Sequence, residues 1–414
     1  MTAPKRHLGE TQRMRSPAET FEAYRRFMPT MGITRIANIT GLDSLGLINY
    51  TAIRPNSRGL TTAQGKGLDD DTARVSALME SVESWHAERI QLPVRYESYA
   101  ELSAVAEVAD ISKLTLATGH RATRDTPLMW VQGEDLFRHT PVYVPYDLIT
   151  MNTVHPAEHT PTYWISTDGL ASGNHPLEAT VHALCERIER DAVALWFATT
   201  EAPRPVDLST VADPRCRQLM DMLRAAECEA VAWDMTSDVG VPTYGCYVLE
   251  RPGRETAGGL GFYHGFASHL DATAALYKAI IEAIQGRVTF ISGTRDDLFY
   301  EHYEQLRDPA LLAGMWEEIA AGAATATRWT GEPSLSTDTF EGDLRLLLAA
   351  LERAGFDRAI AVDLSRPEIG IPVVKVIVPG LEVMPDPEAE PGARVRALQQ
   401  QQQQAAADDE ERQP

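Results

Sequence analysis

The stretch from Thr167 to Trp196 reads TDGLASGNHPLEATVHALCERIERDAVALW. A glycine-containing turn opens this stretch and leads into a predicted helix. His182, Glu186 and Glu189 fall on one face of that helix, because residues three and four positions apart lie on neighbouring turns. Two acids and a histidine on one face are costly to bury unless a cation lies against them. The stretch therefore predicts a helix whose polar face meets a positively charged group.

The same arrangement occurs in two other predicted helices. Each helix carries a polar residue, a glutamate four positions later, and an acid or amide three positions after that. The three sets are Ser76, Glu80 and Glu83; His182, Glu186 and Glu189; and Lys278, Glu282 and Gln285. Leu68-Asp69 and Leu270-Asp271 stand at the same distance before the first and third sets. These shared offsets favour three related helix–loop units over three unrelated amphipathic helices whose polar faces meet water.

Several glutamates that converge on one place need neutralising charge. Mg²⁺ ions bound to nucleotide phosphates provide it, since Mg²⁺ prefers carboxylate oxygens and water as ligands. Lys66 lies in Thr61–Asp71, which we predict to be a polar glycine-rich loop, and it can meet a phosphate, as can Arg287. The loop lacks the spacing of a P-loop, so the sequence indicates a different nucleotide site.

Composition narrows the function further. The 414-residue chain has a formal net charge of −21, which argues against a nucleic-acid groove. Its four cysteines match no zinc pattern, and it shows neither a secretory signal nor an apolar run long enough to span a membrane. We therefore expect reduced thiols, a cytoplasmic protein, and no membrane partner.

Mixed strand-like and helical segments along the chain predict an α+β fold built from related helix–loop units. We expect an N-terminal extension and first helix over residues 1–30, with Ser16 and Glu19 as a capping box at the start of that helix. The first 20 residues are expected to fray. A catalytic body is expected over residues 31–384. Residues 385–414 are rich in proline, glutamine and acids, and we expect them to be disordered.

Three parts of the chain resemble the ATP-binding motifs of the YcaO superfamily. They are Ser76, Glu80 and Glu83; the run Asp168 to Asn174 with His182, Glu186, Glu189, Arg190 and Asp191; and Glu282, Gln285 and Arg287. The resemblance covers about Ile33 to Glu382. It implies mixed sheets with helices packed around an ATP site, and an enzyme that uses ATP to phosphorylate the oxygen of a peptide backbone amide. Many members have Glu-Arg where this chain has Glu83-Ser84, so one arginine contact has no counterpart here.

The resemblance also implies roles for individual residues. Carried over by position, Lys66 and Ser76 would contact the nucleotide. The residues implied to hold Mg²⁺ or orient phosphate are Glu80, Glu83, Glu186 and Glu189. Those implied to complete the pocket are His182, Glu282, Gln285 and Arg287. No residue is assigned as the catalytic base.

Two reactions are implied by different subgroups. Azoline-forming cyclodehydratases commonly end in Pro-x-Pro-x-Pro, whereas the proline run Pro385–Pro391 has another spacing. The segment Gly370–Glu382 is more similar to the subgroup that works with a TfuA partner and is associated with backbone thioamides. We therefore expect a peptide or protein substrate, a TfuA-like protein and a sulfide donor as partners, with a homodimer left open. Azoline formation from Cys, Ser or Thr, and a non-catalytic ATP-binding scaffold of a peptide-modification complex, are the alternatives.

Overall fold

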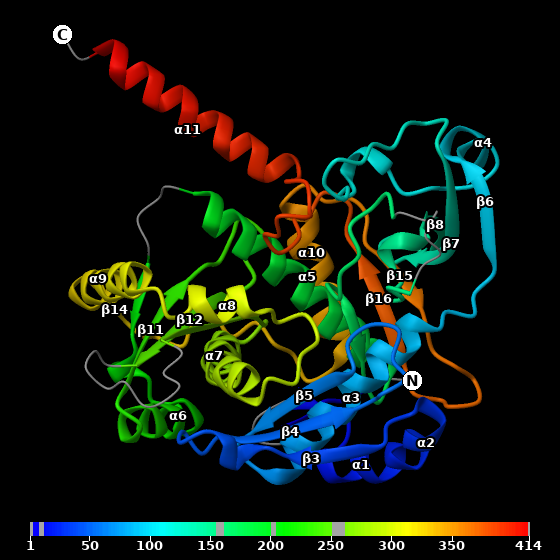
Figure 1. Ribbon diagram of the computed structural model, residues 1–414. Coiled ribbons are helices and arrows are strands. Elements are labelled where there is room, and N and C mark those ends of the chain that lie inside the picture. The colour runs from blue at the N-terminus through cyan, green and yellow to red at the C-terminus, as the bar shows by residue number, and fades with distance from the viewer. Residues whose placement is uncertain (1–2, 8–11, 155–160, 200–203, 251–260, 413–414) are drawn as a thin grey trace.

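The computed structural model describes residues 3–7, 12–154, 161–199, 204–250 and 261–412, with side chains described as far as residue 404. Its three large sheets and the helices packed on them confirm the predicted α+β fold (Figure 1). Sheet one is antiparallel and runs β3 (Arg35–Asn38), β4 (Ile48–Ile53), β5 (Thr62–Gly67). Sheet two runs β13 (Phe262–Ser268), β12 (Thr243–Glu250), β11 (Cys228–Asp234), β10 (Pro205–Asp207), β14 (Thr327–Arg328). Sheet three runs β6 (Val94–Ser98), β7 (Pro127–Asp135), β15 (Ile360–Asp363), β16 (Val373–Ile377), β9 (Leu170–Ser172), with β8 (Thr140–Pro145) also on β7.

The three predicted helices each follow a strand of a different sheet. Helix α3 (Asp70–Glu88) follows β5, α5 (Pro176–Ala198) follows β9, and α7 (Ala272–Ser292) follows β13. The shorter elements are β1 (Arg6–His7), β2 (Gln12–Arg13), α1 (Pro17–Tyr24), α2 (Met28–Met31), α4 (Tyr99–Ser103), α6 (Pro214–Ala225), α8 (Tyr300–Gln305), α9 (Pro309–Thr325) and α10 (Phe340–Arg353). In the part of the chain described here, helices that are both apolar enough and long enough to cross a membrane are absent.

Glycines let two of these helices approach their strands closely. A Cβ on Gly65 of β5 would lie 2.1 Å from the backbone nitrogen of Ala77 and 2.2 Å from the carbonyl oxygen of Ala73, both on α3. A Cβ on Gly265 of β13 would lie 2.3 Å from the backbone nitrogen of Ala283 on α7. Real Cβ atoms do not make such contacts, so only glycine fits at either position. The first and third units therefore share a packing device as well as a sequence pattern.

Helix caps explain the matched Leu-Asp pairs. Asp69 caps α3 by accepting a hydrogen bond from the backbone N–H of Thr72 at 2.8 Å, and Asp271 caps α7 in the same way through Ala274 at 2.8 Å. The predicted capping box of α1 is also confirmed, because Ser16 and Glu19 bond each other's backbone N–H groups.

Two predictions about the chain ends are wrong for the residues that the structure describes; residues 1–2, 8–11 and 413–414 lie outside them. Residues 393–412 form helix α11, which projects from the body in Figure 1, rather than a disordered tail. The buried carboxylate of Glu382 caps this helix by accepting from the backbone N–H groups of Gly392 at 2.7 Å and Arg394 at 2.8 Å. At the other end, the buried Lys5 forms an ion pair with Asp343 at 2.6 Å. Asp343 lies far from Lys5 in the sequence, and Glu382 lies before the segment 385–414 whose composition predicted disorder. The composition of either chain end therefore does not reveal these contacts.

The prediction of a loop over Thr61–Asp71 is also wrong, because residues 62–67 form strand β5. The glycines of this segment serve close packing against α3, not a flexible phosphate loop. Lys66 therefore lies on a strand whose position is set by the sheet, which gives its side chain a defined direction.

Candidate functional site

A cavity of about 690 Å³ lies among the polar faces of α3, α5 and α7. Nine of the ten residues predicted for the site line it. They are Lys66, Ser76, Glu80, Glu83, His182, Glu186, Glu189, Glu282 and Gln285. The exception is Arg287. The predicted convergence of the three polar faces is therefore what the fold produces, although the roles assigned to individual residues stay proposals.

The glutamates of α5 share one arginine. Arg190 Nη1 lies 3.1 Å from Glu189 Oε1, and Arg190 Nη2 lies 3.3 Å from Glu186 Oε1. Each glutamate also accepts a backbone N–H bond through its other oxygen. Glu186 accepts from Gly169 at 3.1 Å, and Glu189 accepts from Ser268 on β13 at 3.2 Å. These contacts fix both carboxylates at the cavity wall.

Two glutamates of α3, Glu80 and Glu83, line the same cavity. Glu83 Oε1 accepts hydrogen bonds from both the backbone N–H and the hydroxyl of Ser172, each at 2.7 Å. Lys66 and Arg295 are the cations whose charges favour the ionised form of Glu80. Lys66 Nζ also lies 3.7 Å from Glu282 Oε2 on α7. The cavity thus joins acids from all three helices with cations from β5 and from the segment after α7.

Burial dominates the titration of these acids. Desolvation raises the pKa of Glu80 to about 7 and the pKa values of Glu83 and Glu189 to about 8. It also raises the pKa of Glu186, against the opposing charge of Arg190. The pKa of His182 is held well below its usual range by burial and nearby cations, so His182 is neutral at pH 7. A divalent cation would favour the ionised form of the glutamates.

These pKa values predict a pH-dependent response to metal and nucleotide. The folded pKa values of Glu83 and Glu189 exceed the usual value of 4.5, so these two glutamates stabilise the ligand-free fold fully below about pH 4.5 and lose that contribution as pH rises to about 8. A non-hydrolysable ATP analogue with Mg²⁺ should offset this loss. We expect it to raise the melting temperature more at about pH 8.5 than at about pH 6 in a thermal-shift titration. Equal shifts at both pH values would contradict the expectation.

The cavity residues offer the oxygen ligands that a magnesium–nucleotide complex needs, but they do not form a complete metal site by themselves. Within the described ranges, no three Asp, Glu, His or Cys side chains are close enough together to hold a metal ion by themselves. The carboxylates instead come from different helices, Glu80 and Glu83 from α3 and Glu186 and Glu189 from α5, and all four line the cavity. Mg²⁺ usually binds one or two carboxylates and completes its shell with phosphate and water. The arrangement is compatible with that mode of binding.

Arg287 is the one predicted site residue that lies elsewhere. Its Nε lies 2.8 Å from Asp43 Oδ1, its Nη1 pairs with Glu250, and its guanidinium lies 5.9 Å from the ring centre of Tyr263. Arg287 follows Gln285 by two positions, and residues two apart on a helix do not share a face. In this structure Arg287 belongs to an ion-pair network outside the cavity lining, and its predicted part in the pocket stays a proposal.

Replacing Arg287 with lysine tests this placement. The charge is kept but the two-sided guanidinium contact is lost, so we expect the free energy of unfolding to fall by about 1 kcal/mol. The affinity for the ATP analogue should stay unchanged, as measured by isothermal titration calorimetry. A large loss of affinity in a folded R287K variant would return Arg287 to the site.

Several lining residues were not assigned a site role from the sequence. The cations among them are Arg13, Arg15, Arg190, Lys278 and Arg295. Lys278 and Arg190 lie within or next to the repeated sets, so their spacing was a usable signal. Arg13 and Arg295 come from segments outside the three helices. Arg13 lies on β2 and reaches Glu178 at 3.4 Å, a contact across 165 positions that no local pattern indicates.

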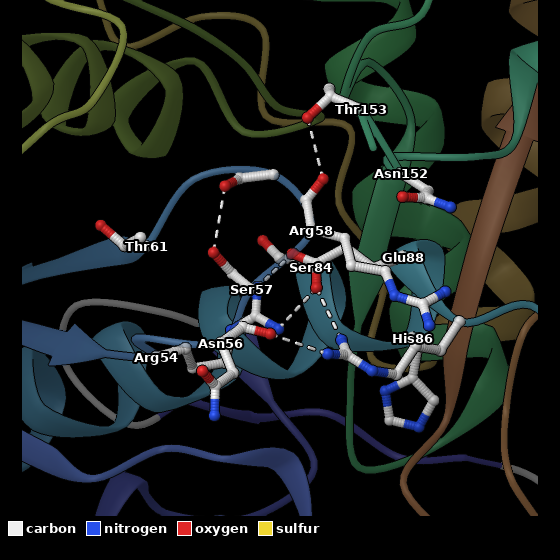
Figure 2. Close-up of polar contacts among 12 residues, drawn as sticks. Arg54, Asn56, Ser57, Arg58, Thr61, Ser84, His86, Glu88, Asn152 and Thr153 are labelled. Atoms are coloured by element: carbon white, nitrogen blue, oxygen red, sulfur yellow. Dashed lines mark hydrogen bonds and ion pairs between the residues drawn. The ribbon is translucent and has the colours of Figure 1, made fainter. Parts of the chain in front are cut away.

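Ser84 stands where many family members have arginine, and Figure 2 shows Arg54 and Glu88 in the same region. The Ser84 hydroxyl donates to the carbonyl oxygen of Glu80 at 3.1 Å. The nearby Arg54 and Arg89 both bind Glu88, at 2.9 Å and 2.7 Å. Since these guanidinium groups are already paired with a buried carboxylate, the positive charge beside Glu80 comes from Lys66 and Arg295 instead.

Comparison with known proteins agrees with this geometry. The family model described as YcaO cyclodehydratase, binding ATP and Mg²⁺, matches residues 64–382. The chain belongs to the YcaO family. The match confirms the predicted family, and its description confirms ATP and Mg²⁺ as the predicted cofactors.

Similar sequences cover most of the YcaO chain. A protein of Rhizobium leguminosarum bv. trifolii, described as an uncharacterized protein in the tfuA 3′ region, is 32% identical over 89% of this chain and 88% of its own length. An uncharacterized protein of Methanothermobacter thermautotrophicus is 33% identical over 92% of this chain and 98% of its own length.

Solved structures confirm the YcaO-type fold. A YcaO protein of Methanopyrus kandleri bound with AMPPCP and Mg²⁺ matches with a TM-score of 0.70 at 22% identity, over 94% of this chain and 99% of that one. A heterocyclase in complex with substrate and cofactor matches with a TM-score of 0.72 at 23% identity. The match covers 92% of this chain but 54% of the heterocyclase chain, so this chain corresponds to about half of the heterocyclase.

Proposed function

We propose that this YcaO protein uses ATP to activate a peptide backbone amide and that a sulfide then replaces the amide oxygen, giving a thioamide. ATP supplies the phosphoryl group, so the amide oxygen leaves as part of inorganic phosphate and sulfur takes its place on carbon. The observation that carries the ATP-dependent part is the convergence of acids from α3, α5 and α7 on one cavity, with Lys66, Lys278 and Arg295 also in its wall.

The chain's own residues divide the work between metal and phosphate. Glu80, Glu83, Glu186 and Glu189 supply the carboxylate oxygens that Mg²⁺ prefers. Lys66 and Ser76 supply a cation and a hydroxyl for the nucleotide. The preorganised N–H contacts of Glu83, Glu186 and Glu189 keep the carboxylates in place, so little rearrangement is needed when charge develops on the phosphoryl group.

A sulfur source outside the chain is part of this proposal, and the state of the four cysteines supports it. All four cysteines are free and buried. Burial raises the pKa of the Cys185 and Cys216 thiols to about 12 and that of Cys228 to about 11, and it raises the pKa of Cys246 further. The thiolate is the form that carries sulfur in exchange reactions, and at neutral pH it is scarce in all four. An external sulfide donor therefore fits this chain better than an internal cysteine relay.

A TfuA-like protein is the proposed partner for that delivery. The support is the Rhizobium relative, which is described by its place beside tfuA. The description of the family as cyclodehydratases favours the alternative, in which a Cys, Ser or Thr side chain attacks the activated carbon and water is lost. The two reactions share the ATP site and differ in the nucleophile.

Mass spectrometry of a reconstituted reaction separates the two products. The chain is incubated with ATP, Mg²⁺, sulfide, a TfuA-like protein and peptides encoded beside its gene. A mass change equal to exchange of oxygen for sulfur supports thioamide formation, whereas loss of one water supports azoline formation. Transfer of a heavy-oxygen label from the peptide amide to phosphate tests activation itself. ATP binding without either product would favour the scaffold alternative and overturn the proposal.

A further inference from the structure

Asp168 is a third carboxylate on Arg190, beside those of Glu186 and Glu189. Asp168 is 7% exposed and precedes β9 in the chain. Its Oδ1 lies 3.3 Å from Arg190 Nε, and its Oδ2 accepts a hydrogen bond from Arg187 Nη1 at 3.3 Å. Arg190 therefore divides one positive charge among three carboxylates, those of Asp168, Glu186 and Glu189.

The turn that carries Asp168 is rigid. Gly169 has φ +76°, and a Cβ there would lie 2.4 Å from the carbonyl oxygen of Val376. Only glycine fits this turn. The Gly169 N–H donates to Glu186 at 3.1 Å, so the same turn holds Glu186 through its backbone and Arg190 through the Asp168 carboxylate.

Residues 375–382 contact the segment that carries Asp168 and the neighbouring Arg187. Lys375 on β16 is buried and donates from Nζ to the carbonyl oxygen of Ser166. Arg187 Nη2 donates to the carbonyl oxygens of Leu381 at 3.2 Å and Glu382 at 3.1 Å. Arg187 thus binds Asp168 through Nη1 and the backbone of Leu381 and Glu382 through Nη2. These contacts outside the cavity hold the Asp168 carboxylate in place.

We propose that Asp168 is a positioning residue that draws Arg190 back from Glu186 and Glu189, and so leaves their oxygens available to Mg²⁺. If the Asp168 charge is removed, the guanidinium pairs with the two glutamates alone. It then competes more strongly with the metal for the same oxygens. This inference rests on the proposed role of Glu186 and Glu189 as metal-binding residues.

The variant Asp168→Asn tests the proposal by metal binding without turnover. Mn²⁺ is titrated in place of Mg²⁺, with a non-hydrolysable ATP analogue present, and free Mn²⁺ is followed by electron paramagnetic resonance. We expect the Mn²⁺ midpoint to rise about tenfold, as for other residues that orient metal ligands. An unchanged midpoint in folded D168N overturns the proposal.

Asp135→Asn is the matched control. Asp135 is a fully buried aspartate that also pairs with two arginines, Arg138 at 2.9 Å and Arg358 at 3.5 Å, but it does not line the cavity. Its substitution should lower stability and leave the Mn²⁺ midpoint unchanged. A shift of equal size in D135N would mean that the D168N effect is a general result of lost packing, and would overturn the proposal.

Three further variants complete the test. Where D168N alone folds poorly, the double variant Asp168→Asn/Lys375→Met keeps the buried charges balanced and carries the same expected shift. In an Arg190→Gln background, Asp168→Asn should no longer move the midpoint, because the competing guanidinium is absent. Glu186→Gln separates the two hypotheses. If E186Q binds Mn²⁺ as the parent does, the metal role of Glu186 fails; if only E186Q weakens binding, the role of Asp168 fails.

Discussion

Replacing Glu189 with glutamine is expected to lower the affinity for a magnesium–ATP analogue complex by about 100-fold, or about 2.8 kcal/mol, which lies in the range for hydrogen bonds to charged groups. Glutamine keeps the size of the side chain but removes the charge. Glu189 joins two of the three helix units, because it bonds Arg190 on α5 and the Ser268 N–H on β13. The measurement is isothermal titration calorimetry at fixed Mg²⁺ concentration.

Glu88→Gln is the control for this experiment. Glu88 is also a buried glutamate paired with arginine, since it binds Arg54 at 2.9 Å and Arg89 at 2.7 Å, but it does not line the cavity. We expect E88Q to destabilise the fold and to keep the affinity of the parent. Equal affinities of E189Q and the parent would show that the cavity acids do not hold the metal–nucleotide complex.

The repeated sets could be predicted because helix periodicity is a local property. Ser76, Glu80 and Glu83 share a face for reasons of geometry alone, and the aligned Asp69 and Asp271 mark the helix starts through capping chemistry. The same geometry could have excluded Arg287, since its distance of two positions from Gln285 places it on another face. Arg287 was predicted for the pocket only because of the family resemblance. In the structure it pairs with Asp43, outside the cavity lining.

The rest of the site depends on contacts that sequence spacing does not encode. Arg13 reaches Glu178 from the N-terminal extension, and Lys5 holds that extension through Asp343. Such long-range ion pairs leave no periodic trace in either segment. The disorder prediction for the tail failed for a similar reason, because the capping carboxylate of Glu382 lies before the biased segment begins. The composition of residues 385–414 describes only that segment, whereas the helix within it is capped by Glu382, which lies outside the segment.

Gly65→Ala is expected to lower the free energy of unfolding by about 3 kcal/mol, at the upper end of the usual range for overpacking. The added Cβ would lie 2.1 Å from the backbone nitrogen of Ala77 and 2.2 Å from the carbonyl oxygen of Ala73. These atoms belong to the helix backbone, so no side-chain rotation relieves the clash and α3 must move away from β5. Lys66 is on the strand and Glu80 is on the helix, so we expect weaker binding of the ATP analogue as well.

Gly41→Ala shows whether the effect comes from this close approach. A Cβ on Gly41 would meet no atom within 4 Å, and this exposed glycine lacks a positive φ, so its substitution should change stability by less than about 0.5 kcal/mol. Urea denaturation of both variants gives the comparison. Similar urea midpoints for G65A and G41A would mean that α3 can move away from β5 without loss of stability. The glycine would then serve the flexible loop first predicted for this segment, and the match with Gly265 on β13 would lose its structural meaning.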